Sequence, residues 1–177
     1  INFKFQTKDS TNGTYGKIYM CDYDFTPIHK KATISIKYVI KDTLKNKTYI
    51  AKVSGKKYIY VGGKWQNNTI TTKINSFGDY AIVADSTRPI IRGVNIYPGK
   101  VIKNQKTLKC TIEDKESGVK SYKATLNKKW VLLDYDHKTK LIKYDFDQNI
   151  IKGKNLFIVF VKDNAGNTKE YKAEFTY

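Results

Sequence analysis

Alternation of apolar and polar side chains, with a period of two, runs through most of this chain and limits its fold more than any other feature. No window of about 11 residues carries a convincing apolar spacing of three and four, which an amphipathic helix requires. Successive side chains of an extended segment point to opposite faces, so a period of two predicts β-strands. We therefore expect an all-β protein.

The predicted strands are short and are separated by residues that favour turns. Asn12-Gly13, Gly62-Gly63 and Pro98-Gly99 are such turn residues, and glycine and asparagine tolerate a positive φ. In the first half we place strands near residues 16–22, 32–40, 48–52, 57–61, 69–74 and 78–84. In the second half we place them near residues 90–97, 107–113, 119–126, 130–135, 141–146, 156–162 and 168–176.

A linker divides the chain into two halves of similar length. Residues 84–89 follow a predicted strand, collect polar turn formers and end in Pro89, which forces Arg88 into an extended conformation. We expect two sandwich-like domains in tandem, at residues 1–86 and 87–177. The second has the strand number and turn spacing of an immunoglobulin-like sandwich of about seven strands.

The positive charge is spread over both halves. Residues 1–86 hold 14 basic and 6 acidic side chains, and residues 87–177 hold 19 and 10, so the halves carry +8 and +9 of the total of +17. Most lysines alternate with apolar residues, which indicates solvated strand faces. Only two arginines occur, although nucleic-acid binders favour this side chain. We expect no nucleic-acid partner and a possible attraction to anionic polymers of a cell envelope.

The cysteines and the hydropathy pattern add two expectations. Cys21 and Cys110 lie in different halves, and no spacing of Cys or His suggests zinc. We predict two buried free thiols and no metal ligands. No run of about 18 apolar residues occurs, so no membrane span is expected. The chain begins with Ile1 rather than Met, and we expect it to be part of a longer polypeptide.

Four aromatic side chains are candidates for ligand binding. Trp65 lies on a polar, glycine-marked hairpin near Tyr58 and Tyr60, and together they could stack against a sugar ring. The competing interpretation is that Trp65 packs into the core. Trp130 follows a turn and opens a strand, and for it the pattern favours a buried core position, with ligand binding as the alternative.

Catalytic motifs are absent from the sequence. It contains no GxSxG, no HExxH and no phosphate-binding glycine-rich loop, so we predict no catalytic residue. Acidic residues gather near Asp114 and Glu116, near Asp145 and Asp147, and near Asp163. Oxygen-rich loops of this kind can bind calcium. Their spacing matches no defined calcium loop, and Asx turns explain the same residues.

Several segments look like the C-terminal region of secreted M23-type (lysostaphin-like) zinc peptidases from some Gram-negative bacteria. The resemblance covers most of residues 60–177 and, more weakly, residues 23–37. The segments that carry it are GVKSYKATLNKKWVLLDYD at 118–136, LIKYDFD at 141–147, VKDNAGN at 161–167 and NSFGDYAIVAD at 75–85. The ending of the third segment also occurs in many bacterial immunoglobulin-like modules.

The resemblance implies a parent enzyme that cuts peptide cross-links in peptidoglycan, with its zinc domain before Ile1. Family members bind zinc through HxxxD and a later HxH, and neither motif is present around His29 or His137. No zinc ligand or catalytic residue can therefore be assigned here, and no cofactor is expected in this fragment. The chain would be an accessory tail in the periplasm, at the outer membrane or outside the cell.

Three functions of different classes remain open at this point. The first is an accessory tail that positions or anchors a wall-lytic peptidase, with peptidoglycan or its own upstream catalytic domain as partner. The second is a carbohydrate-binding module that uses exposed aromatic side chains. The third is a stand-alone enzyme of an unrecognised type.

Overall fold

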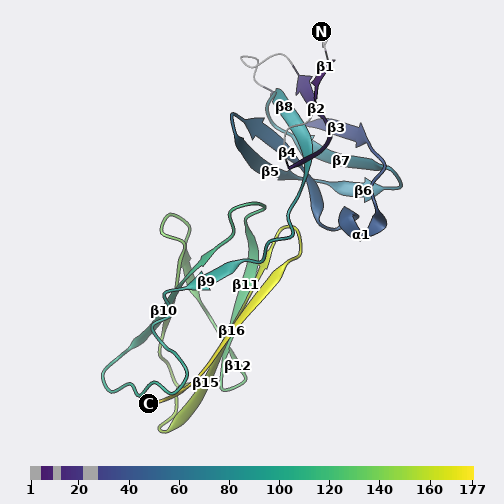
Figure 1. Cartoon of the computed structure of the whole chain (residues 1–177). Coiled ribbons are helices and arrows are strands. Elements are labelled where there is room, and N and C mark those ends of the chain that lie inside the picture. The colour runs from purple at the N-terminus through teal and green to yellow at the C-terminus, as the bar shows by residue number, and fades with distance from the viewer. Residues whose placement is uncertain (1–4, 10–12, 22–27) are drawn as a thin grey trace. The chain divides into compact units, whose positions relative to one another are not determined.

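The computed structural model of the chain describes residues 5–9, 13–21 and 28–177 (Figure 1). The chain divides into two compact units, Ile1–Ser86 and Thr87–Tyr177. This division falls between the same two residues at which the linker pattern separates the predicted domains. Both units consist of antiparallel strands, so the prediction of an all-β protein with two sandwich-like domains in tandem is confirmed.

Two sheets form the described part of the first unit. One has the strand order β1-β2-β8-β4-β5, and the other has the order β3-β7-β6. The elements are β1 (Phe5–Lys8), β2 (Thr14–Cys21), β3 (Ala32–Lys37), α1 (Asp42–Lys45), β4 (Thr48–Ser54), β5 (Lys57–Gly62), β6 (Lys64–Gln66), β7 (Thr69–Ile74) and β8 (Gly78–Ala84).

Buried isoleucines from both sheets make the core of this unit. Ile50 and Ile82 come from the first sheet, and Ile36 and Ile70 come from the second. All four are at most 2% exposed. Because each sheet buries one set of alternating side chains against the other, the unit is a sandwich.

The alternation pattern did not predict the short elements β1, β6 and α1. Gly62-Gly63, which the pattern places in a turn, is the point where the chain passes from β5 in one sheet to β6 in the other. Gly63 has φ 155°, and a Cβ atom added there would lie 2.7 Å from Cδ1 of Ile70. A side chain does not fit at this crossing. Of the predicted strand at 16–22, residue 22 lies outside the described residues.

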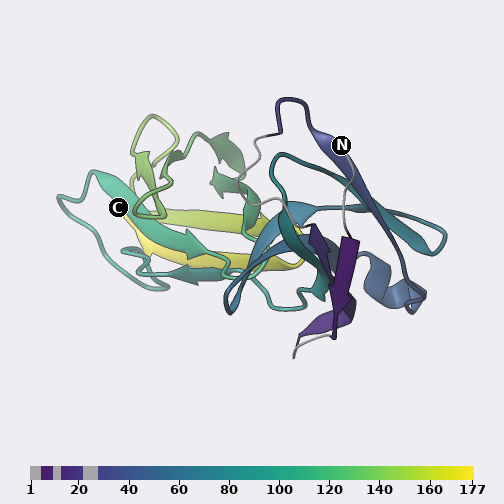
Figure 2. The ribbon, with the colours of Figure 1, turned by 90° about the horizontal axis from the view of Figure 1, so that it is seen from above.

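The second unit, which the structure describes throughout, also contains two sheets. Their strand orders are β13-β14-β10-β9 and β12-β11-β15-β16. Figure 2 shows β15 and β16 side by side along the unit. The strands are β9 (Ile90–Arg92), β10 (Thr107–Glu113), β11 (Val119–Leu126), β12 (Lys129–Val131), β13 (Asp134–Asp136), β14 (Leu141–Asp145), β15 (Lys154–Asp163) and β16 (Thr168–Thr176).

This topology is that of an immunoglobulin-like sandwich. If the strands are lettered along the chain, the first sheet has the order of the A, B, E and D strands, and the second contains C, F and G with one additional strand beside C. After β9, the chain crosses to the other sheet, where Val101 forms a parallel bridge with Thr176. The predicted immunoglobulin-like fold is therefore confirmed.

Two predicted strands of this unit differ from those observed by more than one or two end residues. The strand predicted at 130–135 is two strands, because β12 pairs with β11 in one sheet and β13 pairs with β14 in the other. The chain changes sheet at Leu132 and Leu133, which raises the number of strands in the described second unit from about seven to eight. The strand predicted at 90–97 ends at Arg92, since the following residues lead to the crossing at Val101.

Membrane-spanning helices do not occur in the described ranges. The helix found there, α1, has four residues, and no described helix is long and apolar enough to cross a bilayer.

Truncating the core side chain Phe157 tests the sandwich packing. Phe157 is fully buried in the second core, whereas Phe160 on the same strand is half-buried on the opposite face. Phe157→Ala is expected to lower the free energy of unfolding by about 3–5 kcal/mol. Phe160→Ala is the control, with a smaller loss. Urea denaturation followed by circular dichroism measures both, and an equal or smaller loss for Phe157→Ala contradicts the packing described.

Candidate functional site

Trp130 is the most exposed of the four aromatic candidates. It lies in β12 opposite Thr125 of β11, and 64% of its surface is exposed. The buried-core interpretation of Trp130 is therefore wrong. Its neighbours explain why, since Val131 and Leu133 are buried and fill the inward positions. Alternation then turns Trp130 and Leu132 outward.

The surroundings of Trp130 are apolar side chains with lysines among them. Thr125 also pairs with Ile158 of β15, which pairs in turn with Lys172 of β16. Trp130 therefore shares one cross-strand row with a threonine, an isoleucine and a lysine. In the next row Lys123 pairs with Phe160, which pairs in turn with the exposed Glu170 of β16. We use the name Trp130 face for the side chains of Lys123, Thr125, Trp130, Ile158, Phe160 and Lys172.

The Trp130 face is held in place by the core beneath it. Ala124, Val159 and Ala173 alternate with its members along β11, β15 and β16, and all three are buried in the core of the unit. The Nζ atom of Lys123 lies 5.4 Å from the centroid of the Phe160 ring, within the range of a cation–π interaction. The face is thus a fixed surface on regular strands.

An exposed indole with aliphatic neighbours has a specific chemical use. Its ring can cover the apolar face of a sugar, and Thr125 can exchange hydrogen bonds with sugar hydroxyls. Lys123 and Lys172 can attract carboxylates or phosphates. Large apolar side chains grouped on a surface commonly mark an interaction site.

Trp65 lies in a different setting from Trp130. It is half-buried and packs against the isoleucine core of the first unit. Its Nε1–H donates a hydrogen bond of 2.9 Å to Oγ1 of Thr48, and Nζ of Lys45 lies 5.9 Å from its ring centroid. Trp65 therefore packs against the core, as the competing interpretation of the sequence predicted.

Tyr58 and Tyr60 do not join Trp65 in one platform. They are half-buried and pack against a separate cluster that contains Tyr49, Ala51 and Val83. The rings of Tyr49 and Tyr60 lie 4.8 Å apart, and burial raises the pKa of Tyr60. The sequence placed these tyrosines near Trp65 because they are close along the chain, but they contribute to another cluster.

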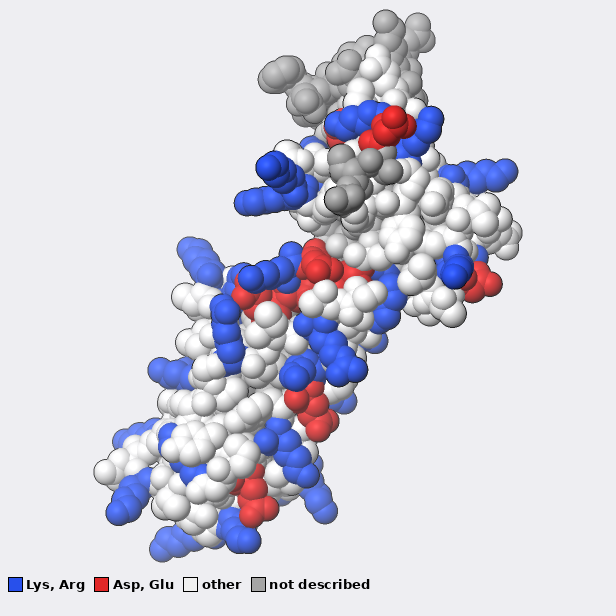
Figure 3. Space-filling view, viewed as in Figure 1, with Lys and Arg blue, Asp and Glu red and all other residues white. Residues whose placement is uncertain are grey.

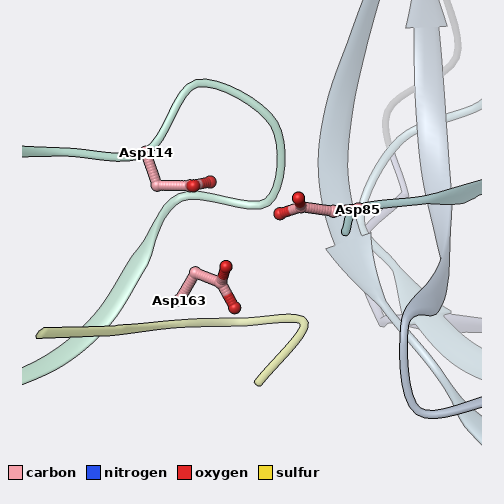
Figure 4. A group of neighbouring side chains, drawn as sticks. All are labelled: Asp85, Asp114 and Asp163. Atoms are coloured by element: carbon pink, nitrogen blue, oxygen red, sulfur yellow. The ribbon is translucent and has the colours of Figure 1, made fainter. Parts of the chain in front are cut away.

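Two aspartates of the second unit lie on neighbouring loops (Figure 4). Carboxylate oxygens of Asp114 and Asp163 lie within 4.8 Å of each other. Asp114 accepts a hydrogen bond of 2.7 Å from Gly118 N–H, and Asp163 accepts bonds of 2.7 and 2.8 Å from the backbone and the side chain of Asn167. Asp114 also accepts a hydrogen bond of 3.2 Å from Glu116 N–H, two residues on, which is the predicted Asx turn, whereas the bonds of Asp163 reach four residues on and close a wider loop. Asp85, also drawn there, follows β8 in the first unit, and its N–H donates to Lys47 O.

The histidines and cysteines take structural positions. His29 is exposed in the first unit. The ring of His137 lies 4.4 Å from that of Tyr135 in an edge-on contact. Cys21 and Cys110 are both free and buried, which confirms the prediction of two buried free thiols.

A buried glutamate carries an ion-pair network in the second unit. The Glu113 side chain is 9% exposed and pairs with Lys140 and with Arg92, whose Nη2 atom lies 3.1 Å from Oε2. The hydrogen bond from Lys140 is the main cause that lowers the pKa of Glu113 below its ordinary value of 4.5. The network joins β9, β10 and the turn before β14.

Comparison with known proteins adds one family match. Residues 1–85 match the family model of the Zu5-like domain. No curated protein matches the chain. Among solved structures, the fibronectin(III)-like modules of Clostridium thermocellum CbhA align over 81% of this chain and 84% of theirs, with 12% identity and a TM-score of 0.40.

Replacing Glu113 tests the pH dependence of the ion-pair network. Because its pKa is lowered in the folded state, its stabilising effect is complete above about pH 4.5 and is lost as the pH falls through its folded pKa. Glu113→Gln is expected to unfold at a lower temperature than the wild type at pH 7, and the difference should shrink below pH 4.5. Glu170→Gln, at an exposed position of β16, controls for the lost charge. A difference that grows on acidification contradicts the network.

The buried thiol of Cys110 gives a further test. Burial raises its pKa to about 12, and the residue is 0% exposed. Since the thiolate is the reactive form, iodoacetamide at pH 8 should leave Cys110 unmodified in the folded chain and modify it fully in urea. Mass spectrometry of the peptide that contains Cys110 reads the result. Rapid modification without denaturant would show that the second core is open.

Proposed function

We propose that this chain is a non-catalytic accessory module of an M23-type cell-wall peptidase, and that its Trp130 face binds glycan strands of peptidoglycan. The exposed indole of Trp130 on a regular strand carries the proposal. Cutting of the peptide cross-links is assigned to a zinc domain elsewhere in the parent protein. No residue of this chain is proposed as a zinc ligand.

The shape of the Trp130 face suits an extended polysaccharide. Trp130, Thr125, Ile158 and Lys172 form a row across four neighbouring strands. A sugar ring stacked on the indole would place the next sugar over Thr125 and Ile158, and such a row binds a chain without enclosing it. Strand geometry also fixes the side chains before binding, which reduces the entropy lost on association.

Charge supports an anionic wall polymer as the ligand. Two lysines, Lys123 and Lys172, and one glutamate, Glu170, lie in the two rows of the Trp130 face, and the second unit carries +9 in total, from 19 basic and 10 acidic side chains. Peptidoglycan presents carboxylates beside its sugars, so stacking and charge attraction act on the same ligand. The proposal places the protein in the periplasm, at the outer membrane or outside the cell.

The polar loop residues have structural roles, which agrees with a binding function for the module. Asp114, Asp163 and Asn164 hydrogen-bond to the turns around them, and Glu113 is held by Lys140 and Arg92. These groups stabilise the sandwich on which the Trp130 face is built. The module would then increase the local concentration of its enzyme at the wall, which raises the rate of cutting without any new chemistry.

Truncating Trp130 tests this function. Trp130→Ala is expected to weaken binding to insoluble peptidoglycan about thirtyfold, the loss typical of an aromatic hot spot, and to leave the unfolding temperature unchanged because the side chain is exposed. Tyr97→Ala, which removes another exposed aromatic ring of the second unit, should bind as the wild type does. Co-sedimentation over a range of protein concentrations measures all three proteins.

Two results would contradict the proposal. One is equal peptidoglycan binding by Trp130→Ala and the wild type. The other is the absence of any binding by the wild type to peptidoglycan, together with tight binding of the Trp130 face to the isolated peptidase domain, which would make the face an interdomain contact.

A further inference from the structure

Three exposed apolar side chains lie in the loops of the second unit that follow β9 and β14. Tyr97 is 55% exposed, Val101 is 64% exposed and Ile151 is 52% exposed. All three lie outside the regular strands, at exposed positions where a polar side chain would not lower the stability of the fold. Apolar side chains grouped on a surface commonly mark a site that contacts a protein or a membrane.

Backbone hydrogen bonds bring the loops together. Val101 forms its bridge with Thr176. Gly153 and Tyr177 exchange two hydrogen bonds of 2.8 and 2.9 Å, and Asn127 Nδ2 donates to Asn149 O at 2.9 Å. Residues 97–106, 127–128 and 146–153 therefore lie around the end of β16, where Figure 1 marks the C-terminus. We call these three loops the basic end.

The charge of the basic end is strongly positive. Its loops contain five lysines and one aspartate, a difference of +4, and the loops at the opposite end, residues 113–118, 137–140 and 163–167, contain four acidic residues and three lysines, a difference of −1. Asp147, the aspartate of the basic end, accepts a hydrogen bond of 2.5 Å from Tyr144 Oη. Figure 3 shows Lys and Arg side chains over the whole unit, the basic end included, and the largest group of acidic side chains at the opposite end. The lysines are Lys100, Lys103, Lys106, Lys128 and Lys152.

Internal contacts hold the loop of Tyr97 and Val101 in its exposed position. Lys100 Nζ donates to Asn95 O at 2.5 Å and to Gln105 Oε1 at 3.0 Å, and it lies 5.4 Å from the centroid of the Tyr97 ring. Next to Val101, Ile102 is 4% exposed and belongs to the core. With Ile102 anchored inward, Val101 points outward.

We propose that the basic end binds the surface of an anionic lipid bilayer. Val101 and Ile151 would enter the interface between headgroups and acyl chains, and Tyr97 would lie at headgroup level, where tyrosine is enriched. Lys103, Lys128 and Lys152 would contact the anionic headgroups. A soluble polyanion could bind the lysines but would leave Val101 and Ile151 in water. An anionic lipid surface provides both a partner for the lysines and an apolar environment for these two side chains.

Vesicle flotation with the full chain tests this surface. The wild type is expected to float with vesicles of phosphatidylglycerol and phosphatidylcholine, and not with phosphatidylcholine alone. Lys103→Glu with Lys152→Glu should lower the affinity more than tenfold, because each lysine near an anionic surface contributes about fivefold. The matched control, Lys115→Glu with Lys138→Glu, changes the net charge equally at the opposite end and should retain most of the binding.

A second variant tests the contribution of the exposed aliphatic side chains Val101 and Ile151. Val101→Ser with Ile151→Ser keeps every charge and should lower vesicle affinity about tenfold, since both side chains are exposed and the fold does not depend on them. Trp130→Ala should float as the wild type does, so this binding succeeds or fails independently of peptidoglycan binding.

Three results would overturn the lipid surface. The first is no flotation of the wild type with anionic vesicles. The second is an equal loss in both charge variants, which would mean attraction by net charge alone. The third is unchanged flotation of Val101→Ser with Ile151→Ser, which would mean that the lysines bind anions without insertion.

Discussion

Burial of alternating side chains between two facing sheets is the constraint on which the rest of the structure depends. In the second unit Val131 and Leu133 are buried and so turn Trp130 and Leu132 outward. A shift of one residue in this register would bury Trp130 and expose the two core residues. The position of the indole at the surface is thus a consequence of core packing. The same alternation in β15 buries Phe157 and leaves Phe160 on the outer face.

The alternation predicts most of the fold from sequence but does not decide which face is inward. Strands β10, β11 and β16 begin and end at the predicted residues, because each is long and bounded by turn residues. Around Trp130 both faces carry apolar residues, so the pattern alone assigns no side to the core. The change of sheet between β12 and β13 was missed for the same reason, since a run of apolar residues conceals the break.

Candidate sites were predicted less well than strands, because a site depends on which distant residues meet. Tyr58 and Tyr60 are close to Trp65 along the chain, yet they pack against Tyr49 in a separate cluster. The lysines are spread over both halves of the sequence, and no sequence pattern shows that three separate loops bring five of them to the basic end. By contrast, the Asx-turn interpretation holds for Asp114 and Asp147, each of which accepts a hydrogen bond from the backbone N–H two residues on, because such bonding is local.

Mapping of glycan contacts by NMR tests the central claim most directly. Amide chemical shifts of the labelled chain are recorded while soluble peptidoglycan fragments are added. The expected changes are confined to β11, β12, β15 and β16 and are largest around Trp130, with the indole N–H of Trp130 shifting and that of Trp65 staying in place. Changes centred on Tyr58, Tyr60 and Trp65, or no changes at a saturating fragment concentration, would contradict the assignment of glycan binding to the Trp130 face.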